Sequence, residues 1–327
     1  MSELLADYGL FLAELLTLAI VLIVVFAVLA SIARRGARQE GLEVQHLNRR
    51  FEESADALKR AVYGKQRYKK EAKARRRERK RAEQARAKDG SRPRTFVIDF
   101  KGDLRATAVA SLREEVSAVL AIADDGDEVI VRLENSGGTV HEHGLAASQL
   151  LRLKQRGLKL CVAVDKVAAS GGYLMACVAD RIVAAPFAIV GSIGVVAQLP
   201  NFHRLLDEKG IDYEMLTAGR YKRTLSLFAK NTEEGRQKLQ EEIEDVHRLF
   251  KQQIAEHRPQ VDIERVATGE HWYGVRALEL KLVDEIKTSD DLLRETAASR
   301  DLYLVTYKRR KRFAERITGG AETFLAR

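Results

Sequence analysis

Short apolar runs alternate with segments of helical spacing from Thr95 onward. The four runs that we expect to form strands are Thr95–Phe100, Asp127–Leu133, Leu158–Val164 and Arg181–Ala185. Between them, apolar residues recur with helical periodicity over Ala106–Ala123 and from Leu145 to Leu153, which predicts amphipathic helices. Alternating strands and helices favour parallel crossover units, with functional loops at the carboxyl ends of the strands. The sequence therefore predicts an α/β fold.

Further elements are expected downstream of these units. Thr232 is followed by Glu233 and Glu234, which is typical of a helix start, because threonine caps free amide groups and acidic residues suit the first turn. We expect that helix to run to about His257. The other expected elements are a helix over Phe202–Lys209, a strand over Tyr213–Leu216 and a short helix over Gly274–Leu280.

An almost unbroken apolar run extends from Leu15 to Ala33. Its length suits a membrane-spanning helix, and no small-residue cleavage site clearly follows it. We therefore predict an uncleaved N-terminal membrane anchor over residues 1–33; the alternative is a buried core helix. Arg34, Arg35 and Arg38 follow the run directly, and this charge bias indicates that the rest of the chain lies in the cytoplasm.

The net charge of +9 is spread unevenly. Residues 34–92 have few large apolar residues and include the run KARRRERKRAEQARAK, which predicts a charged, basic linker or helix. This segment could contact anionic lipid, bind nucleic acid or act as a spacer. Nucleic acid is not expected, because aromatic residues that stack on bases are nearly absent. Residues 306–327 form a basic tail that could be a short amphipathic helix, which leaves residues 93–305 as the expected catalytic domain.

Several common cofactor sites have no matching pattern. Cys161 and Cys177 lie in apolar stretches and match no CxxC or zinc spacing, so they indicate buried free thiols. His141 and His143 flank Glu142, but residues two apart on a helix point in different directions, so no metal site is predicted. No Walker A sequence occurs, and no dinucleotide fingerprint follows the first strand. No cofactor is therefore expected.

The stretch Ala168–Tyr173 has the arrangement of a nucleophile site. It follows the apolar strand that ends at Val164 and precedes an apolar helix, so Ser170 lies where a strand gives way to a helix N-terminus. Free amide groups there favour developing negative charge, and Gly171 and Gly172 leave room for a substrate backbone. The alternative is an ordinary turn in which the serine caps the helix.

A serine nucleophile needs a base. Among the seven histidines, His203 and His271 remain candidates for a catalytic triad. A lysine can serve instead if an apolar or cation-rich pocket keeps it neutral. Lys222 follows an expected strand and lies in a glycine-containing turn beside Tyr221, although a surface lysine is the default interpretation.

Three motifs occur in order along the chain: Ala169–Tyr173, Gly191–Val195 and Gly219–Lys222. Together they resemble the signature of the signal peptide peptidase A family of serine–lysine proteases. The segment Ile98–Asp103, together with the N-terminal anchor, is most similar to the SohB branch of that family. The resemblance covers about Thr95 to Ile286, and three ordered motifs are much more specific than any one of them.

The resemblance implies a role for each matching residue. Ser170 matches the nucleophile and Lys222 the general base, while Ser192 matches a hydroxyl that holds the lysine amine in place. The implied mechanism begins when neutral Lys222 takes the proton of Ser170, which attacks a peptide carbonyl. Lys222 then protonates the leaving amine, and water resolves the acyl-enzyme.

The loop Asn135–Gly138 matches the family's glycine-rich oxyanion loop. We expect an amide of Gly137 or Gly138, together with that of Gly171, to face the oxyanion. The family often has a proline before the two glycines. Ser136 stands at that position here, so the loop geometry is less rigidly set.

The resemblance also implies a fold of the ClpP and crotonase superfamily, with stacked strand–helix units and assembly into a homo-oligomeric ring. The implied activity is that of a membrane-anchored serine endopeptidase that hydrolyses signal-peptide remnants or misfolded and membrane-associated polypeptides at the bacterial cytoplasmic (inner) membrane. An apolar pocket that keeps the lysine neutral also favours small or apolar side chains at the cleavage site. Family members generally act on the outer side of the membrane, opposite to the side that the arginines indicate.

Two alternative functions belong to other classes of protein. A crotonase-like acyl-CoA enzyme has similar oxyanion loops, but it needs neither a lysine paired with Ser170 nor a membrane anchor. An inactive membrane scaffold could use the basic segment and the same fold. The presence of Ser170, Lys222 and Ser192 together argues against the scaffold.

Overall fold

The computed structural model describes residues 40–74 and 92–309, together with helical residues 9, 11, 13, 15–24, 26 and 77. Glu43–Thr306 form one compact unit, and a second unit comprises Met1–Leu42 and Tyr307–Arg327. Over the residues described, no helix combines the length and apolar character needed to cross a membrane. The predicted anchor lies partly outside them: 15–24 and 26 are helical, and the remainder of 15–33 is not described.

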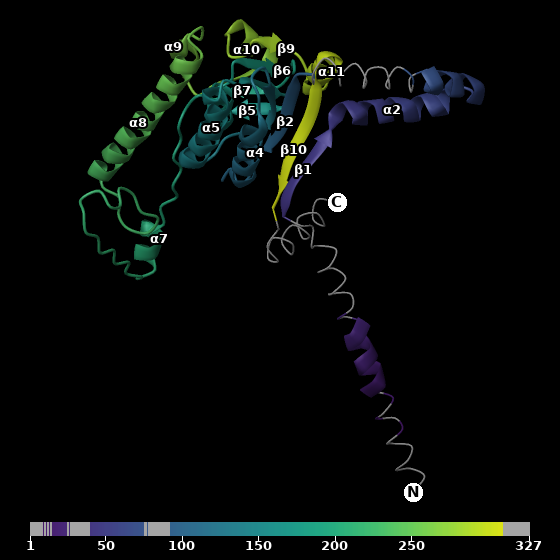
Figure 1. The fold of residues 1–327 in the computed structure, drawn as a ribbon. Coiled ribbons are helices and arrows are strands. Elements are labelled where there is room, and N and C mark those ends of the chain that lie inside the picture. The colour runs from purple at the N-terminus through teal and green to yellow at the C-terminus, as the bar shows by residue number, and fades with distance from the viewer. Residues whose placement is uncertain are drawn as a thin grey trace. The chain divides into compact units, whose positions relative to one another are not determined.

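A seven-stranded sheet forms the centre of the compact unit, with the strand order β1-β10-β2-β3-β4-β6-β9. Every pair from β10 to β9 is parallel, and Figure 1 shows the strands between the helices. The bounds are β1 Gly41–His46, β2 Arg94–Lys101, β3 Glu128–Glu134, β4 Lys159–Val164, β6 Arg181–Ala184, β9 Glu285–Ile286 and β10 Asp301–Lys308. The predicted α/β fold and its four strands, which are β2, β3, β4 and β6, are confirmed.

Helices cover both faces of this sheet. On one face, Ile98 and Val131 pack with the apolar sides of α4 (Val109–Ile122), α5 (Val140–Gln155) and α6 (Gly171–Ala176). The alternate residues Val97 and Ile130 pack on the other face with α2 (Leu47–Val62) and α11 (Ser289–Ser299). Because successive strand residues point to opposite faces, continuous apolar runs are what a sheet buried on both sides requires.

A second, three-stranded sheet lies next to the main one. Its order is β5 (Val167–Ala169), β7 (Ile189–Gly191) and β8 (His271–Tyr273). The pair β5–β7 is parallel, with Ala169 opposite Gly191, and the pair β7–β8 is antiparallel. The sequence pattern did not predict β5. Ser170 therefore follows this short strand, and not the strand ending at Val164 as expected.

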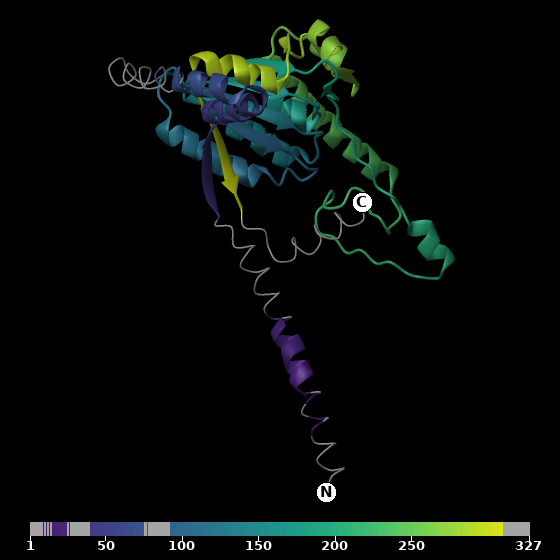
Figure 2. The same cartoon turned by 90° about the vertical axis from the view of Figure 1, so that its right-hand side faces the viewer.

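Residues 199–231 form an arm that carries α7 (His203–Glu208). Both ribbon views show it projecting beyond the N-terminal end of α8 (Glu233–His257), away from the two sheets (Figures 1 and 2). The predicted strand over Tyr213–Leu216 is wrong: these residues are irregular and exposed, and they pair with no strand of the described chain. Thr232 caps α8 as predicted, accepting the amide of Gly235 at 3.1 Å.

The remaining helices complete the unit: α9 (Ile263–Val266) follows α8, and α10 (Gly274–Glu279) matches the predicted short helix. The charge-rich segment 34–92 contains more regular structure than its composition indicated. Besides β1 and α2, residues 65–74 are helical. Buried Leu47 and the Asn48 side chain, which donates to the carbonyls of Ala297 and Arg300 at 3.1 and 2.9 Å, attach the start of α2 to the sheet. Strand β10 crosses the expected boundary at 305, and the predicted tail helix lies outside the described residues after 309.

Candidate active site

Ser170 lies at the end of β5, immediately before α6. Its backbone has φ 51° and ψ −120°, a region that non-glycine residues rarely occupy. The Ser170 amide donates to the carbonyl of Gly191 at 2.7 Å, which holds the residue between β5 and β7. Such local strain persists only where the surroundings impose it, and it clusters at functional sites.

The glycine-rich loop after β3 lies directly against Ser170. A Cβ on Gly137, which has φ +92°, would lie 2.7 Å from the Cβ of Ser170. A Cβ on Gly138, at φ +156°, would lie 2.0 Å from the carbonyl oxygen of Leu104. Glycine is therefore required at position 137 for the loop to approach Ser170 so closely, and at position 138 for it to pass against the backbone of Leu104.

The amide hydrogen bonds distinguish the three expected oxyanion donors. The amide of Gly137 donates to Asn135 Oδ1 at 2.8 Å, so it is already engaged. The amides of Gly138 and Gly171 have no acceptor within the described chain. Of the three amides, those of Gly138 and Gly171 are therefore available to a bound group, whereas that of Gly137 is not.

Ser192 follows the end of β7 in the same way that Ser170 follows the end of β5. Because Ala169 and Gly191 are opposite each other in the parallel pair β5–β7, the next residues of both strands, Ser170 and Ser192, leave the sheet side by side. Ser192 also has a positive φ, 53°, and its amide donates to the carbonyl of Glu270 at 2.7 Å. Both serines line the same cavity.

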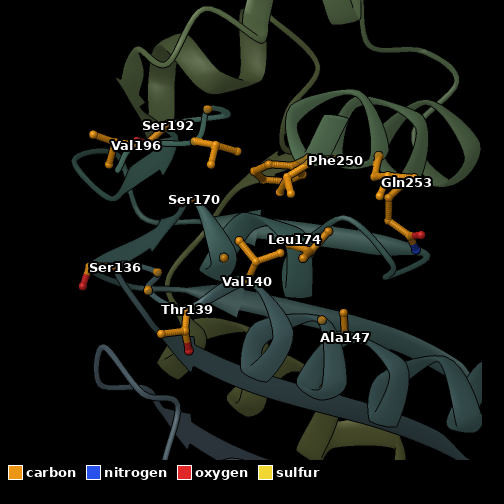
Figure 3. Close-up of a pocket in the computed structure, with 18 of the residues that line it drawn as sticks. Ser136, Thr139, Val140, Ala147, Ser170, Leu174, Ser192, Val196, Phe250 and Gln253 are labelled. Carbon is orange, nitrogen blue, oxygen red and sulfur yellow. The ribbon is translucent and has the colours of Figure 1, made fainter. Parts of the chain in front are cut away.

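That cavity has a volume of about 980 Å³. Figure 3 shows the lining residues, with Val140 and Ala147 of α5 on one side, Phe250 and Gln253 of α8 on the other, and Ser170 between them. All its lining residues belong to the described part of the chain, and none of them is charged or a histidine. The site thus offers a serine and free amides beside an apolar surface, but no base from within the cavity.

Lys222 is not brought to Ser170 within one chain. It is exposed, it lies on the arm, and it is absent from the cavity lining. The alternative bases are also elsewhere: His203 starts α7 on the arm, and His271 is exposed in β8.

His141 and His143 point in different directions, as their spacing predicts. His141 is exposed, whereas His143 is fully buried with its ring nitrogens near oxygen atoms of Thr139 and Asn135. No group of three or more metal-binding side chains gathers among the residues that the structure describes. No sequence pattern indicates that Asn135 and His143 meet, because that contact depends on how α5 packs behind the loop.

Both thiols lie in the core region. Burial raises the pKa of Cys161 to about 12, and burial raises that of Cys177 to about 12 as well. Neither lines the cavity. A thiol that stays protonated is a poor nucleophile, so neither cysteine is a candidate nucleophile for this site.

Comparison with known proteins identifies the class. Residues 3–150 match the profile described as peptidase family S49 N-terminal, and residues 152–303 match peptidase family S49. The "Probable protease SohB" of Haemophilus influenzae is 46% identical over 332 residues, covering 98% of this chain and 94% of the relative. The protein of the same name from Buchnera aphidicola subsp. Acyrthosiphon pisum is 57% identical over 228 residues, covering 70% of this chain and 68% of the relative.

Solved structures of proteases are also similar. The 1510-N membrane-bound stomatin-specific protease, in complex with a substrate peptide, gives a TM-score of 0.45 at 12% identity, covering 71% of this chain and 99% of that one. The ClpP protease catalytic domain from Plasmodium falciparum gives 0.38 at 10% identity, covering 59% and 85%. The sequence matches, which span nearly the whole chain, place it among the proteases. The chain belongs to peptidase family S49, as its motifs indicated.

Proposed function

We propose that this protein is a serine endopeptidase in which Ser170 is the nucleophile and Lys222 the general base. The observation that carries the proposal is the strained Ser170, in contact with Gly137 and facing an apolar cavity that Ser192 shares. Ser170 attacks the peptide carbonyl, and the amides of Gly138 and Gly171 stabilise the oxyanion. One such donor typically contributes about 3 kcal/mol to transition-state stabilisation.

The base reaches this site from a neighbouring subunit. The cavity holds no charged group of its own, and Lys222 is exposed on an arm that projects from the compact unit. Large apolar side chains of the arm are also exposed, among them Phe202, Leu205, Ile211, Tyr213, Leu216 and Tyr221. An exposed surface of this kind is typical of a protein interface. Docked onto the next subunit of a homo-oligomeric ring, the arm would bring Lys222 toward Ser170.

In that assembly, Ser192 is the hydroxyl that holds the lysine amine. It leaves β7 beside Ser170 and lines the same cavity, so an amine placed between the two hydroxyls would contact both. Enclosure by apolar side chains favours the neutral form of a lysine, which a general base requires.

The cavity determines which peptides are cleaved. Its walls include Leu151, Leu174 and Phe250 and carry no charge, so a charged side chain would be buried there without a partner. We expect the full-length protein to cleave casein and to prefer small or apolar residues next to the cut in a peptide library. Library profiling by mass spectrometry checks this, and a preference for Lys, Arg, Asp or Glu beside the cut would contradict it.

We also propose that the N-terminal segment anchors the enzyme in the bacterial cytoplasmic membrane, where signal-peptide remnants and misfolded or membrane-associated polypeptides are its substrates. The apolar run from Leu15 to Ala33 and the arginines that follow it support this proposal. An anchored chain stays in the membrane fraction during extraction at alkaline pH, whereas a peripherally bound one is released. Release of the intact protein under these conditions would contradict the anchor.

A further inference from the structure

His143 is a fully buried titratable side chain behind the proposed oxyanion site, and the mechanism above does not use it. It belongs to the first turns of α5, which begins directly after the glycine-rich loop. Its ring Nδ1 lies 2.9 Å from the carbonyl oxygen of Thr139, and its Nε2 lies 3.2 Å from Asn135 Oδ1. Most buried polar side-chain atoms have at least one hydrogen-bond partner, so these two short contacts define the surroundings of the ring.

Asn135 connects His143 to the glycine-rich loop. Its side chain is 1% exposed, and its Oδ1 accepts the amide of Gly137 at 2.8 Å. Its backbone is fixed to β5, because its amide donates to Val167 at 2.9 Å and its carbonyl accepts from Ala169 at 3.0 Å. The Asn135 side chain therefore orients Gly137 and, through it, the peptide that carries the free amide of Gly138.

The same ring also contacts the second oxyanion donor. A Cβ on Gly171 would lie 2.5 Å from Cγ of His143, so the imidazole packs directly on the backbone that follows Ser170. One buried side chain thus touches both segments that would supply the oxyanion donors. The distance between these two backbone segments sets the position of the Gly138 amide relative to the Gly171 amide.

The hydrogen bonds of Asn135 indicate which ring nitrogen of His143 carries a proton. The Gly137 amide needs an oxygen acceptor, which fixes Oδ1 of Asn135 toward the loop, so His143 Nε2 must carry a proton to hydrogen-bond the same oxygen. The Thr139 carbonyl already accepts the backbone amide of His143 at 3.2 Å. A proton on Nε2 therefore makes the contact with Asn135 a hydrogen bond. The Thr139 carbonyl keeps the backbone amide as its donor, and Nδ1 lies beside that carbonyl without donating to it.

We propose that His143 is a positioning residue for the oxyanion hole. Its Nε2–H donates to Asn135 Oδ1, which holds the Gly137–Gly138 peptide so that the Gly138 amide faces the oxyanion together with that of Gly171. The inference rests on the proposed function, because it assigns a role in the same site.

The test compares two replacements of similar length in the full-length protein. His143→Gln keeps an N–H that can reach Asn135, whereas His143→Met fills the space without a donor. We expect His143→Met to lower kcat roughly 10- to 100-fold with KM within about twofold, because a small misplacement of a catalytic group has an effect of this size. His143→Gln keeps most of the parental kcat, and the exposed control His141→Met keeps all of it.

A transition-state analogue separates positioning from general damage. A peptide aldehyde forms a hemiacetal with Ser170 whose oxygen occupies the oxyanion site, so its affinity should fall in step with kcat/KM in His143→Met. Parental kcat in His143→Met, or equal losses of kcat and of melting temperature in both variants, would overturn the inference. A parent protein that neither cleaves peptides nor reacts at Ser170 with a fluorophosphonate probe would overturn the proposed function itself, and this inference with it.

Discussion

Replacing Ser170 by alanine is expected to reduce peptidase activity by up to roughly 10⁶-fold, the scale of the loss when the serine nucleophile of a protease is removed. The reason is chemical: the remaining amides of Gly138 and Gly171 can stabilise an oxyanion, but no acyl-enzyme can form. The measurement is the cleavage of casein and of a fluorogenic apolar peptide by the full-length protein. Labelling with a fluorophosphonate probe should be lost in parallel.

The control for this variant is Ser117→Ala. Ser117 lies on α4, and its hydroxyl donates to the carbonyl of Arg113 at 2.7 Å, on the surface of the molecule. It should retain parental activity and labelling. Alanine at position 170 must adopt the same positive φ as serine, so the melting temperature of Ser170→Ala should stay close to that of the parent. Activity that persists in Ser170→Ala would exclude a serine-nucleophile mechanism at this site.

The strands that carry the site were predictable because they are buried on both faces. β4, for example, is apolar from Leu160 to Val164, and a run of this kind is visible in the sequence. The strands β5 and β7 each span three residues, Val167–Ala169 and Ile189–Gly191, too few to show a period. They nevertheless decide the geometry, since their register places Ser170 beside Ser192.

Other features depend on contacts between distant parts of the chain. The alternating residues of Tyr213–Leu216 have strand character, yet they lie on the arm, where the described chain supplies no partner strand to complete their hydrogen bonds. The contact between His143 and Asn135 arises only when α5 packs behind the loop. Buried Leu47 is one apolar residue at the start of a highly charged helix, so composition, which indicated a charged linker or helix, did not show that it packs in the core.

The proposed role of Lys222 as the base could not be predicted from its local sequence, for a different reason. Its local sequence is that of a surface turn, and in the single chain it is a surface residue. Only the family resemblance singled it out, and the structure explains why local sequence could not. A lysine that becomes enclosed only in a neighbouring subunit has no apolar surroundings of its own along the chain. In the proposed assembly, the role of Lys222 would therefore depend on the neighbouring subunit.

The second large effect on activity is expected for substitution of Lys222, the proposed base from a neighbouring subunit. We expect Lys222→Ala to reduce activity by a factor similar to that of Ser170→Ala, because the Ser170 hydroxyl then has no base. The neighbouring cation Arg223, also exposed on the arm, provides the matched control, and Arg223→Ala should keep most of the activity. Parental activity in Lys222→Ala would mean that another group is the base and would return His203 and His271 to consideration.

Mixing the two inactive variants distinguishes a base within the subunit from one supplied by a neighbour. In rings isolated after co-expression of Ser170→Ala and Lys222→Ala subunits, roughly a quarter of the sites should combine an intact serine with an intact lysine if each site is shared between adjacent subunits. Such rings should recover about that fraction of parental activity. Rings that contain both subunits and stay inactive would show that Lys222 does not act across the interface, and since one chain does not bring it to Ser170, the arm would then have to fold back onto its own cavity.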